Sequence, residues 1–225
     1  MRLRFCPSWI VAGPALLLLM TPPPAFAQTD GNGVACIPVS ERARREFGCF
    51  ILATQIIGPL DSAHAFWHLS TFATRSAAEA AAGPHGKVVE SLGTMWLLTI
   101  AGARWRPSQG THVAAIGPLP VARGVAYTAQ YMEAVLRPGM KSLVHRHSGP
   151  EAWYTLAGET CLETPAGTLV GRAGGSPIIV SQGPPMELTA TGTEVRRALV
   201  LIIHDSAQPA TSPAPDWRPK GLCKV

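Results

Sequence analysis

Two histidines and a glutamate are spaced closely enough in this sequence to hold a metal ion. His145 and His147 are two residues apart, so on a β-strand both imidazoles point to the same face. Residues 148–150 (Ser-Gly-Pro) then turn the chain, and Glu151 opens the returning strand. A hairpin that brings two imidazoles and a carboxylate together inside a barrel suits a divalent metal and leaves positions open for water or substrate. We therefore predict a metal site at these three residues.

Two glycines frame the same group, and the whole stretch resembles a known family motif. Gly139 and Gly158 complete the pattern G-x5-H-x-H-x3-E-x6-G. This pattern resembles the first motif of the cupin superfamily at all five positions. The resemblance implies a single RmlC-like or quercetinase-like cupin barrel, that is, a double-stranded β-helix with a jelly-roll-like fold. It does not distinguish Fe, Mn, Zn, Ni or Cu as the cofactor, and a site without metal remains an alternative.

The second cupin motif is incomplete in this sequence. The family pattern is roughly G-x5-P-x-G-x2-H-x3-N, and Gly175, Ser181 and Gly183 fall in register with it. Met186 stands at the position of the metal-binding His, and Ala190 at that of the Asn. A thioether is a weak, soft donor that suits copper(I) better than harder divalent ions. Three alternatives follow: three protein ligands with more water, a substitute ligand, or loss of the metal.

Several neighbours of the motif could contribute to the site. Glu187 adjoins Met186 but should face the opposite side of its strand, because side chains alternate along a strand. His204 could point inward, although we expect it to lie too far from the hairpin. Gln130, Tyr131 and Met132 lie on the strand that enters the motif, and some of them could line a pocket.

The elements around the motif predict a mainly β chain. From residue 121 to 206, short apolar runs alternate with Gly/Pro turns, which is typical of a barrel or sandwich. The expected strands cover residues 125–137, 143–147, 153–156, 161–163, 168–170, 178–180, 186–190 and 194–204. Residues 207–225 form a Pro-rich tail, which we expect to pack along the barrel with Trp217 as an anchor.

Residues 28–120 predict a small α+β region ahead of the barrel. Expected strands cover 49–57, 66–72, 87–91 and 94–100, with a short helix over 40–47 and another, capped by Thr74 or Ser76, ending at Ala82. The order resembles half of a ferredoxin-like module of the antibiotic-biosynthesis-monooxygenase type. His64 and His68 are four apart, but the alternating pattern favours a strand, which argues against a shared metal.

The first 27 residues predict a signal peptide. Arg2 and Arg4 precede an apolar stretch from Trp9 to Met20, and residues 25–27 (Ala-Phe-Ala) form a cleavage site. The apolar stretch is shorter than the roughly 20 residues that cross a membrane. Cleavage leaves 17 of the 19 Lys and Arg against 14 acids, a net charge of +3 instead of +5. We therefore expect a periplasmic or secreted protein with no membrane or nucleic-acid partner.

Cysteine usage agrees with export. Cys36, Cys49, Cys161 and Cys223 remain after cleavage, and an even number in an oxidising compartment indicates disulfides, although three connectivities are open. Cys36 and Cys49 bracket the helical stretch 40–47, so closing that loop is reasonable. Cys161 and Cys223 would then pin the tail.

Two functions of different classes fit these observations. The first is an exported oxygenase-type enzyme acting on a small molecule, in which Glu151 is a metal ligand and proton acceptor. The second is a non-catalytic cupin module that binds a ligand or a partner, with Met186 marking a degenerate metal site. The family resemblance adds the expectation of a homodimer. The sequence does not decide whether the protein is an enzyme.

Overall fold

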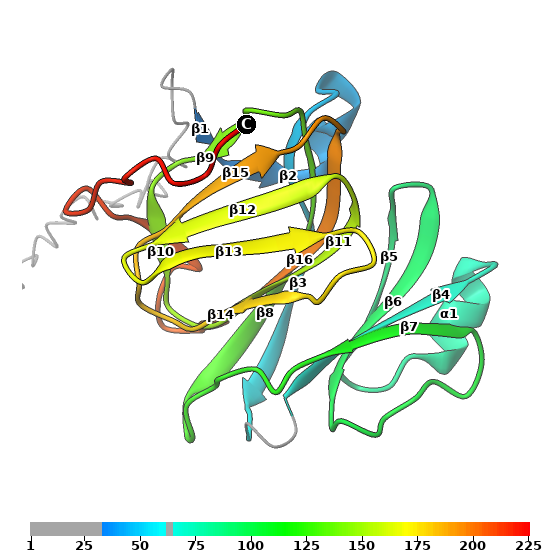
Figure 1. Cartoon of the computed structure of the whole chain (residues 1–225). Coiled ribbons are helices and arrows are strands. Elements are labelled where there is room, and N and C mark those ends of the chain that lie inside the picture. Colours follow the sequence, from blue (N-terminus) through cyan, green and yellow to red (C-terminus); the bar gives the residue numbers. More distant parts are fainter. Residues whose placement is uncertain (1–32, 62–64) are drawn as a thin grey trace, which may run out of the picture.

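Two facing β-sheets form a barrel in the computed structural model, which describes residues 33–61 and 65–225 (Figure 1). One sheet has the order β1 (Gly33–Val34), β9 (Lys141–Ser142), β15 (Glu187–Thr191), β12 (Glu159–Thr164) and β13 (Gly167–Arg172). The other has the order β14 (Ile178–Val180), β11 (Glu151–Ala157), β16 (Arg196–Asp205), β8 (Ala126–Leu136), β3 (Gly48–Pro59) and β2 (Cys36–Pro38). A separate antiparallel pair consists of β10 (His145–His147) and β17 (Thr211–Pro213).

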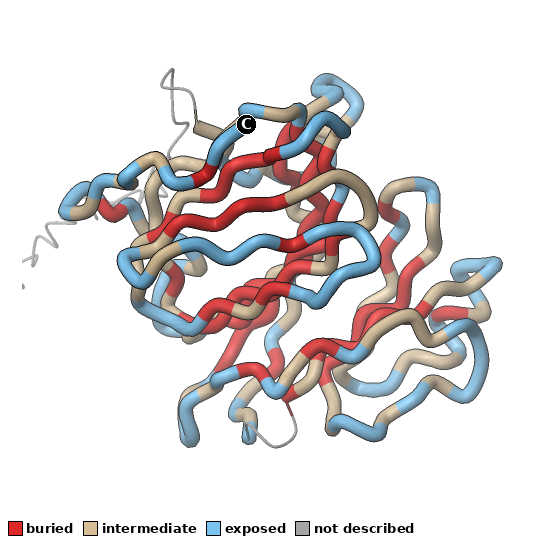
Figure 2. The backbone as a smooth tube through the Cα atoms, viewed as in Figure 1, coloured by how far each residue is buried: buried red, intermediate tan, exposed pale blue. Residues whose placement is uncertain are grey.

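This architecture confirms the mainly β, jelly-roll-like fold class. Each strand expected between residues 121 and 206 has a counterpart, and one of them is shorter than expected. Of the expected strand over 143–147 only β10 forms, and the separate two-residue strand β9 precedes it with a different partner. Figure 2 shows that the strands facing the barrel interior are buried, whereas β13 at the sheet edge is mostly exposed.

The near-continuous apolar sequence of β16 follows from burial on both of its faces. Val200 and Ile202 point into the barrel and join a cluster with Trp153 of β11 and Leu188 of β15. The alternate residues 199, 201 and 203 (Leu, Leu, Ile) point out of the barrel and join a second cluster. A strand with both faces buried needs apolar residues at successive positions, which removes the polar alternation of a half-exposed strand.

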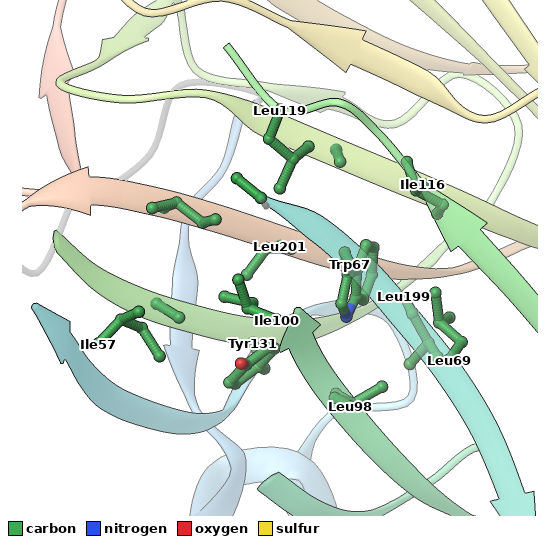
Figure 3. Close-up of a cluster of buried hydrophobic side chains, with 14 of the residues drawn as sticks. Ile57, Trp67, Leu69, Leu98, Ile100, Ile116, Leu119, Tyr131, Leu199 and Leu201 are labelled. Atoms are coloured by element: carbon green, nitrogen blue, oxygen red, sulfur yellow. The ribbon is translucent and has the colours of Figure 1, made fainter. Parts of the chain in front are cut away.

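The second cluster lies between the barrel and a smaller sheet. That sheet has the order β5 (Gly86–Ser91), β6 (Thr94–Ala101), β4 (Phe66–Phe72) and β7 (Thr111–Ile116), all antiparallel, and carries the helix α1 (Arg75–Ala81). Because β6 lies between β4 and β5, those two strands run parallel to each other. In Figure 3, Trp67 and Leu98 of the small sheet lie close to Tyr131 and Leu199 of the barrel.

The N-terminal region differs from the sequence prediction in one respect. Residues 28–120 were expected to form a unit of their own, but β1, β2 and β3 within this range pair with strands of the barrel. β3 pairs along its length with β8, from Gly48 opposite Val135 to Pro59 opposite Ala126. In the sequence, the small sheet is therefore inserted between β3 and β8, which are paired neighbours in the barrel. Local periodicity identifies β3 as a strand but carries no information on a partner so far along the chain.

The local details of this region largely match the expectations. Thr74 caps α1 by accepting a hydrogen bond from the backbone N–H of Ala77. The helix expected over 40–47 is a shorter 3-10 helix, η1 (Val39–Arg44), whose N-cap is Pro38. The expected signal peptide and His64 lie outside the described residues. Within the residues described, no helix has the length and apolar character needed to cross a membrane.

Two disulfides join the four cysteines in the expected connectivity. Cys36 is bonded to Cys49 and Cys161 to Cys223. The second disulfide fixes the end of the tail against β12, where the buried carboxylate of Glu163 also accepts hydrogen bonds from the backbone N–H groups of residues 220 and 222. The tail therefore lies along the barrel, as Figure 1 shows for its last, red segment.

Candidate metal centre

A tight turn between β10 and β11 brings the predicted ligands together. His145 and His147 lie on β10, and Glu151 is the first residue of β11. Gly149 in the turn packs directly on β16, because a Cβ atom built there would lie 1.8 Å from the carbonyl oxygen of Ile203. Only glycine allows this approach, so Gly149 is a further structural requirement of the site that the five-position motif does not contain.

The two imidazoles are oriented by backbone carbonyls. Nδ1 of His145 donates a hydrogen bond to the carbonyl of Leu143 at 2.6 Å, and Nδ1 of His147 donates to the carbonyl of Ala210 at 2.8 Å. Since a carbonyl only accepts, the proton of each neutral ring lies on Nδ1 and leaves the lone pair on Nε2. The two Nε2 atoms are 3.1 Å apart. Two lone pairs at this distance repel each other unless a proton or a cation lies between them.

The carboxylate of Glu151 completes the cluster. Its Oε2 lies 3.4 Å from Nε2 of His147 and, among the described residues, has no hydrogen-bond partner. Burial alone would raise the pKa of the Glu151 carboxyl, but the adjacent His147 lowers that pKa below its ordinary value. Burial likewise opposes a charge on His147, but Glu151 raises the pKa of His147. Burial and the neighbouring His147 lower the pKa of His145.

These distances fit a divalent metal with two nitrogen ligands and one oxygen ligand. The three ligand atoms lie within 4.8 Å of one another. Metal–nitrogen bonds of ~2.1 Å place neighbouring ligand atoms about 3.0–3.4 Å apart for angles between octahedral and tetrahedral. Hydrogen bonds that fix the non-ligating nitrogen of each imidazole are the usual second contact of metal-binding histidines. The separations of 3.1 Å between the two Nε2 atoms and 3.4 Å from Nε2 of His147 to Oε2 of Glu151 lie in this range, so the three residues could together hold a metal.

A cavity of about 530 Å³ adjoins the cluster. Its wall carries the three candidate ligands together with apolar side chains from both barrel sheets, among them Trp153, Leu188 and Val200. Arg196 also lines the cavity. Cavities of this size that combine apolar walls with a few polar groups are typical of small-molecule sites.

The remaining residues considered from the sequence lie in different places. Met186 pairs with His145 through two backbone hydrogen bonds, and its fully buried side chain belongs to the apolar cluster inside the barrel. Glu187 points away and forms an ion pair with Lys141 at 2.7 Å. Of the three residues on the entering strand, Gln130 lines the cavity.

Two other histidines are outside this centre. His204 is bound by the backbone carbonyls of Asp205 and Gln208 rather than facing the ligand cluster. His68 lies on a strand, as expected, and its Nδ1 is 3.3 Å from Nε2 of His112. Within the described part of the chain, the only group of three or more potential ligands close enough to share a metal is that of His145, His147 and Glu151.

Two contributions to the site come from segments that the motif does not include. The C-terminal tail forms one wall of the cavity, because β17 pairs with β10 and Ala210 holds the ring of His147. Arg196, at the start of β16, is fully buried against the same cavity. A Pro-rich tail and one arginine of an Arg-Arg pair are weak signals, and only the strand pairing places them here.

Solved structures of cupin proteins resemble the barrel at low sequence identity. A cupin-like protein from Thermotoga maritima is 13% identical, the match covering 38% of this chain and 64% of that protein, with a TM-score of 0.35. A predicted oxalate decarboxylase from the same organism is 24% identical, covering 33% and 64%, with a TM-score of 0.30. An oxalate oxidase in complex with the substrate analogue glycolate is 17% identical, covering 40% and 46%, with a TM-score of 0.32. No family model and no curated protein matches the chain.

Proposed function

We propose that this chain, whose barrel is of the cupin type, binds a divalent transition metal through His145, His147 and Glu151 and takes a small organic molecule into the adjoining cavity. One observation carries the proposal: two Nε2 lone pairs face each other at 3.1 Å beside a buried carboxylate oxygen that has no hydrogen bond within the described structure. A bound cation removes the repulsion and supplies the missing partner. The open coordination positions would face the cavity.

The metal site is tested by titration of chelator-treated protein. Zn²⁺, Mn²⁺, Fe²⁺, Ni²⁺ and Cu²⁺ are added separately, and at least one should bind with a stoichiometry of one per chain. His145→Ala should lower its affinity at least about 100-fold, because a ligand is lost rather than a contact around it. His204→Ala is the matched control, since that ring contacts backbone carbonyls away from the cluster. Equal binding by both variants would contradict the proposal.

An oxygenase-type reaction is the enzymatic form of this proposal. A 2-His-1-carboxylate set with open positions is the ligand set of non-haem Fe(II) oxygenases. The neighbouring His147 lowers the pKa of Glu151, which favours the ionised carboxylate that a metal needs as a ligand and makes it a weaker proton acceptor than an ordinary glutamate. O₂ consumption by the Fe²⁺-loaded protein with enol-type and flavonoid substrates, lost in Glu151→Gln, would be the expected result.

The alternative is a ligand-binding module without turnover. Met186 favours it, because an apolar side chain stands opposite His145 where a fourth protein ligand would be expected. In that case, ligands bind to the metal-loaded protein and are recovered unchanged. The same O₂ measurement separates the two functions.

We further propose that the protein works in an oxidising compartment. Two disulfides support this, since such bonds are formed and kept in secreted and periplasmic proteins. Mass analysis of protein isolated from its own host tests both features: the mature chain should begin at Gln28 and carry no free thiol. A chain that retains residues 1–27, or that is fully reduced, would contradict export.

A further inference from the structure

Arg196 is a buried cation whose guanidinium is only partly bonded by the protein. The residue is fully buried at the start of β16. Its Nε donates a hydrogen bond to the hydroxyl of Thr160 on β12, but Nη1 and Nη2 have no partner among the described residues. A buried charge without a hydrogen-bonding partner is strongly unfavourable, and proteins normally pair it or place it against a ligand.

The polypeptide around Arg196 holds it in this place. Gly158, at the exit of the motif strand, has a φ of +66°, and a Cβ atom there would lie 2.8 Å from the Cα of Arg196. The glycine therefore lets the turn after β11 pack directly on the backbone that carries the guanidinium. Thr160 holds the Nε side of the guanidinium, and the buried Nη1 and Nη2 atoms have no acceptor among the described residues.

The charge of the cavity explains what kind of acceptor is needed. Among the residues that the structure describes, Arg196 and Glu151 are the only Asp, Glu, Lys or Arg residues that line it. Burial lowers the pKa of Arg196 to about 10, opposed by the charge of Glu151, so the guanidinium is still protonated at neutral pH. A divalent metal on Glu151 would use the negative charge of that carboxylate. With or without a metal, Nη1 and Nη2 of Arg196 have no acceptor in the described structure, so the acceptor would have to come from a bound anion.

The position of Arg196 indicates the shape of the ligand. Glu151 pairs with Ile202 across β11 and β16, and Arg196 lies six residues before Ile202 in β16, which places the Cα atoms of Ile202 and Arg196 about 20 Å apart. The cavity wall between Glu151 and Arg196 includes the apolar side chains of Val200 and Trp153. A ligand that reaches from Arg196 towards Glu151 would therefore need an anionic end at Arg196 and an apolar body along this wall.

We propose that Arg196 binds the carboxylate of a small organic acid with an apolar body inside the barrel cavity. The proposal names the substrate class of the site described above, and it rests on the proposed function for the premise that this cavity takes a ligand. A planar guanidinium with two free donors matches a carboxylate in a bidentate arrangement. The carboxylate supplies the hydrogen bonds that Nη1 and Nη2 lack and balances the charge of the guanidinium. The other end of the acid faces the metal cluster.

The test compares an acid with its neutral amide. Hexanoate and 4-phenylbutyrate, and the corresponding primary amides, are titrated into chelator-treated wild-type protein by calorimetry. At least one acid should bind about tenfold or more tightly than its amide, which is the factor expected for a charge-assisted hydrogen bond. Arg196→Met should reduce this ratio to about twofold or less. Arg197→Met is the matched control, because that neighbouring arginine is exposed, and should leave the ratio unchanged.

Other outcomes decide against the proposal or separate it from the metal site. Failure of both acids to bind wild type, equal binding of acid and amide, or a ratio that survives in Arg196→Met overturns it. If Arg196→Met does not fold by circular dichroism, Arg196→Lys replaces it: the point charge lacks the two-donor fork, so the ratio should fall, and an unchanged ratio overturns the proposal. Glu151→Gln should lose metal binding and keep the acid preference, so failure of the proposed metal function is recognised independently.

Discussion

Removal of the disulfide between Cys161 and Cys223 should destabilise the protein more than removal of the one between Cys36 and Cys49. The first closes a loop with a sequence separation of 62 residues and the second one of 13. If a disulfide acts by restricting the unfolded chain, these loops correspond to about 4 and about 3 kcal/mol at 25 °C. The longer bond also fixes the tail segment whose backbone N–H groups are bound by the buried Glu163.

The measurement is urea denaturation of oxidised Cys161→Ala/Cys223→Ala and Cys36→Ala/Cys49→Ala beside the wild type. Cys161→Ala/Cys223→Ala should lose about 4 kcal/mol of unfolding free energy, equivalent to a fall in Tm of roughly 8–16 °C for a chain of this size. Cys36→Ala/Cys49→Ala should lose about 1 kcal/mol less. A larger loss in Cys36→Ala/Cys49→Ala would refute the chain-entropy reasoning, and no loss in either would show that the bonds do not form.

Three further changes test the site. Met186→His should raise Zn²⁺ affinity by about tenfold or more, because residues directly opposite in an antiparallel pair share a face of the sheet; a competition titration with no gain would contradict this geometry. Zn²⁺ affinity should fall as pH decreases below the raised pKa of His147, by about tenfold per pH unit, since the imidazole proton must leave before the metal binds. An affinity that is flat between pH 8 and pH 5 would rule this out. Gly149→Ala should cost about 2 kcal/mol or more in urea denaturation because its Cβ meets the carbonyl of Ile203, whereas Gly83→Ala, which meets nothing within 4 Å, should be near neutral.

The metal cluster could be predicted from the sequence because its members come from one hairpin. His145, His147 and Glu151 lie within seven consecutive residues, so strand alternation and a single turn fix their relation. Most strand limits also follow from local composition, and the even number of cysteines indicates disulfides but leaves three connectivities open. Arg196 could not be placed in this way, because its position in the cavity depends on pairing between strands that are far apart in the chain.

The sequence did not predict that the C-terminal tail forms a wall of the cavity, nor that β3 belongs to the barrel, and both have the same physical reason. Ala210 reaches His147 only because β17 pairs with β10, more than sixty positions earlier in the chain. In the sequence, β3 resembles one more apolar strand of the α+β region. Its partner, however, is β8, which follows the whole inserted sheet in the sequence. Periodicity predicts that a strand exists and which face is apolar, but it does not predict the partner.

The insertion between β3 and β8 has a consequence for how the barrel assembles. The two strands are neighbours in an antiparallel pair, so residues 60–125 occupy the place of a hairpin loop, with Pro59 and Ala126 side by side at its base. An unstructured loop of that length would carry a closure entropy that slows pairing of the strands. β4, which begins the insert, pairs with β7, which ends it, and Trp67 lies opposite Ile116, so formation of the small sheet brings the two ends of the insert together. We therefore expect formation of the small sheet to favour the pairing of β3 with β8.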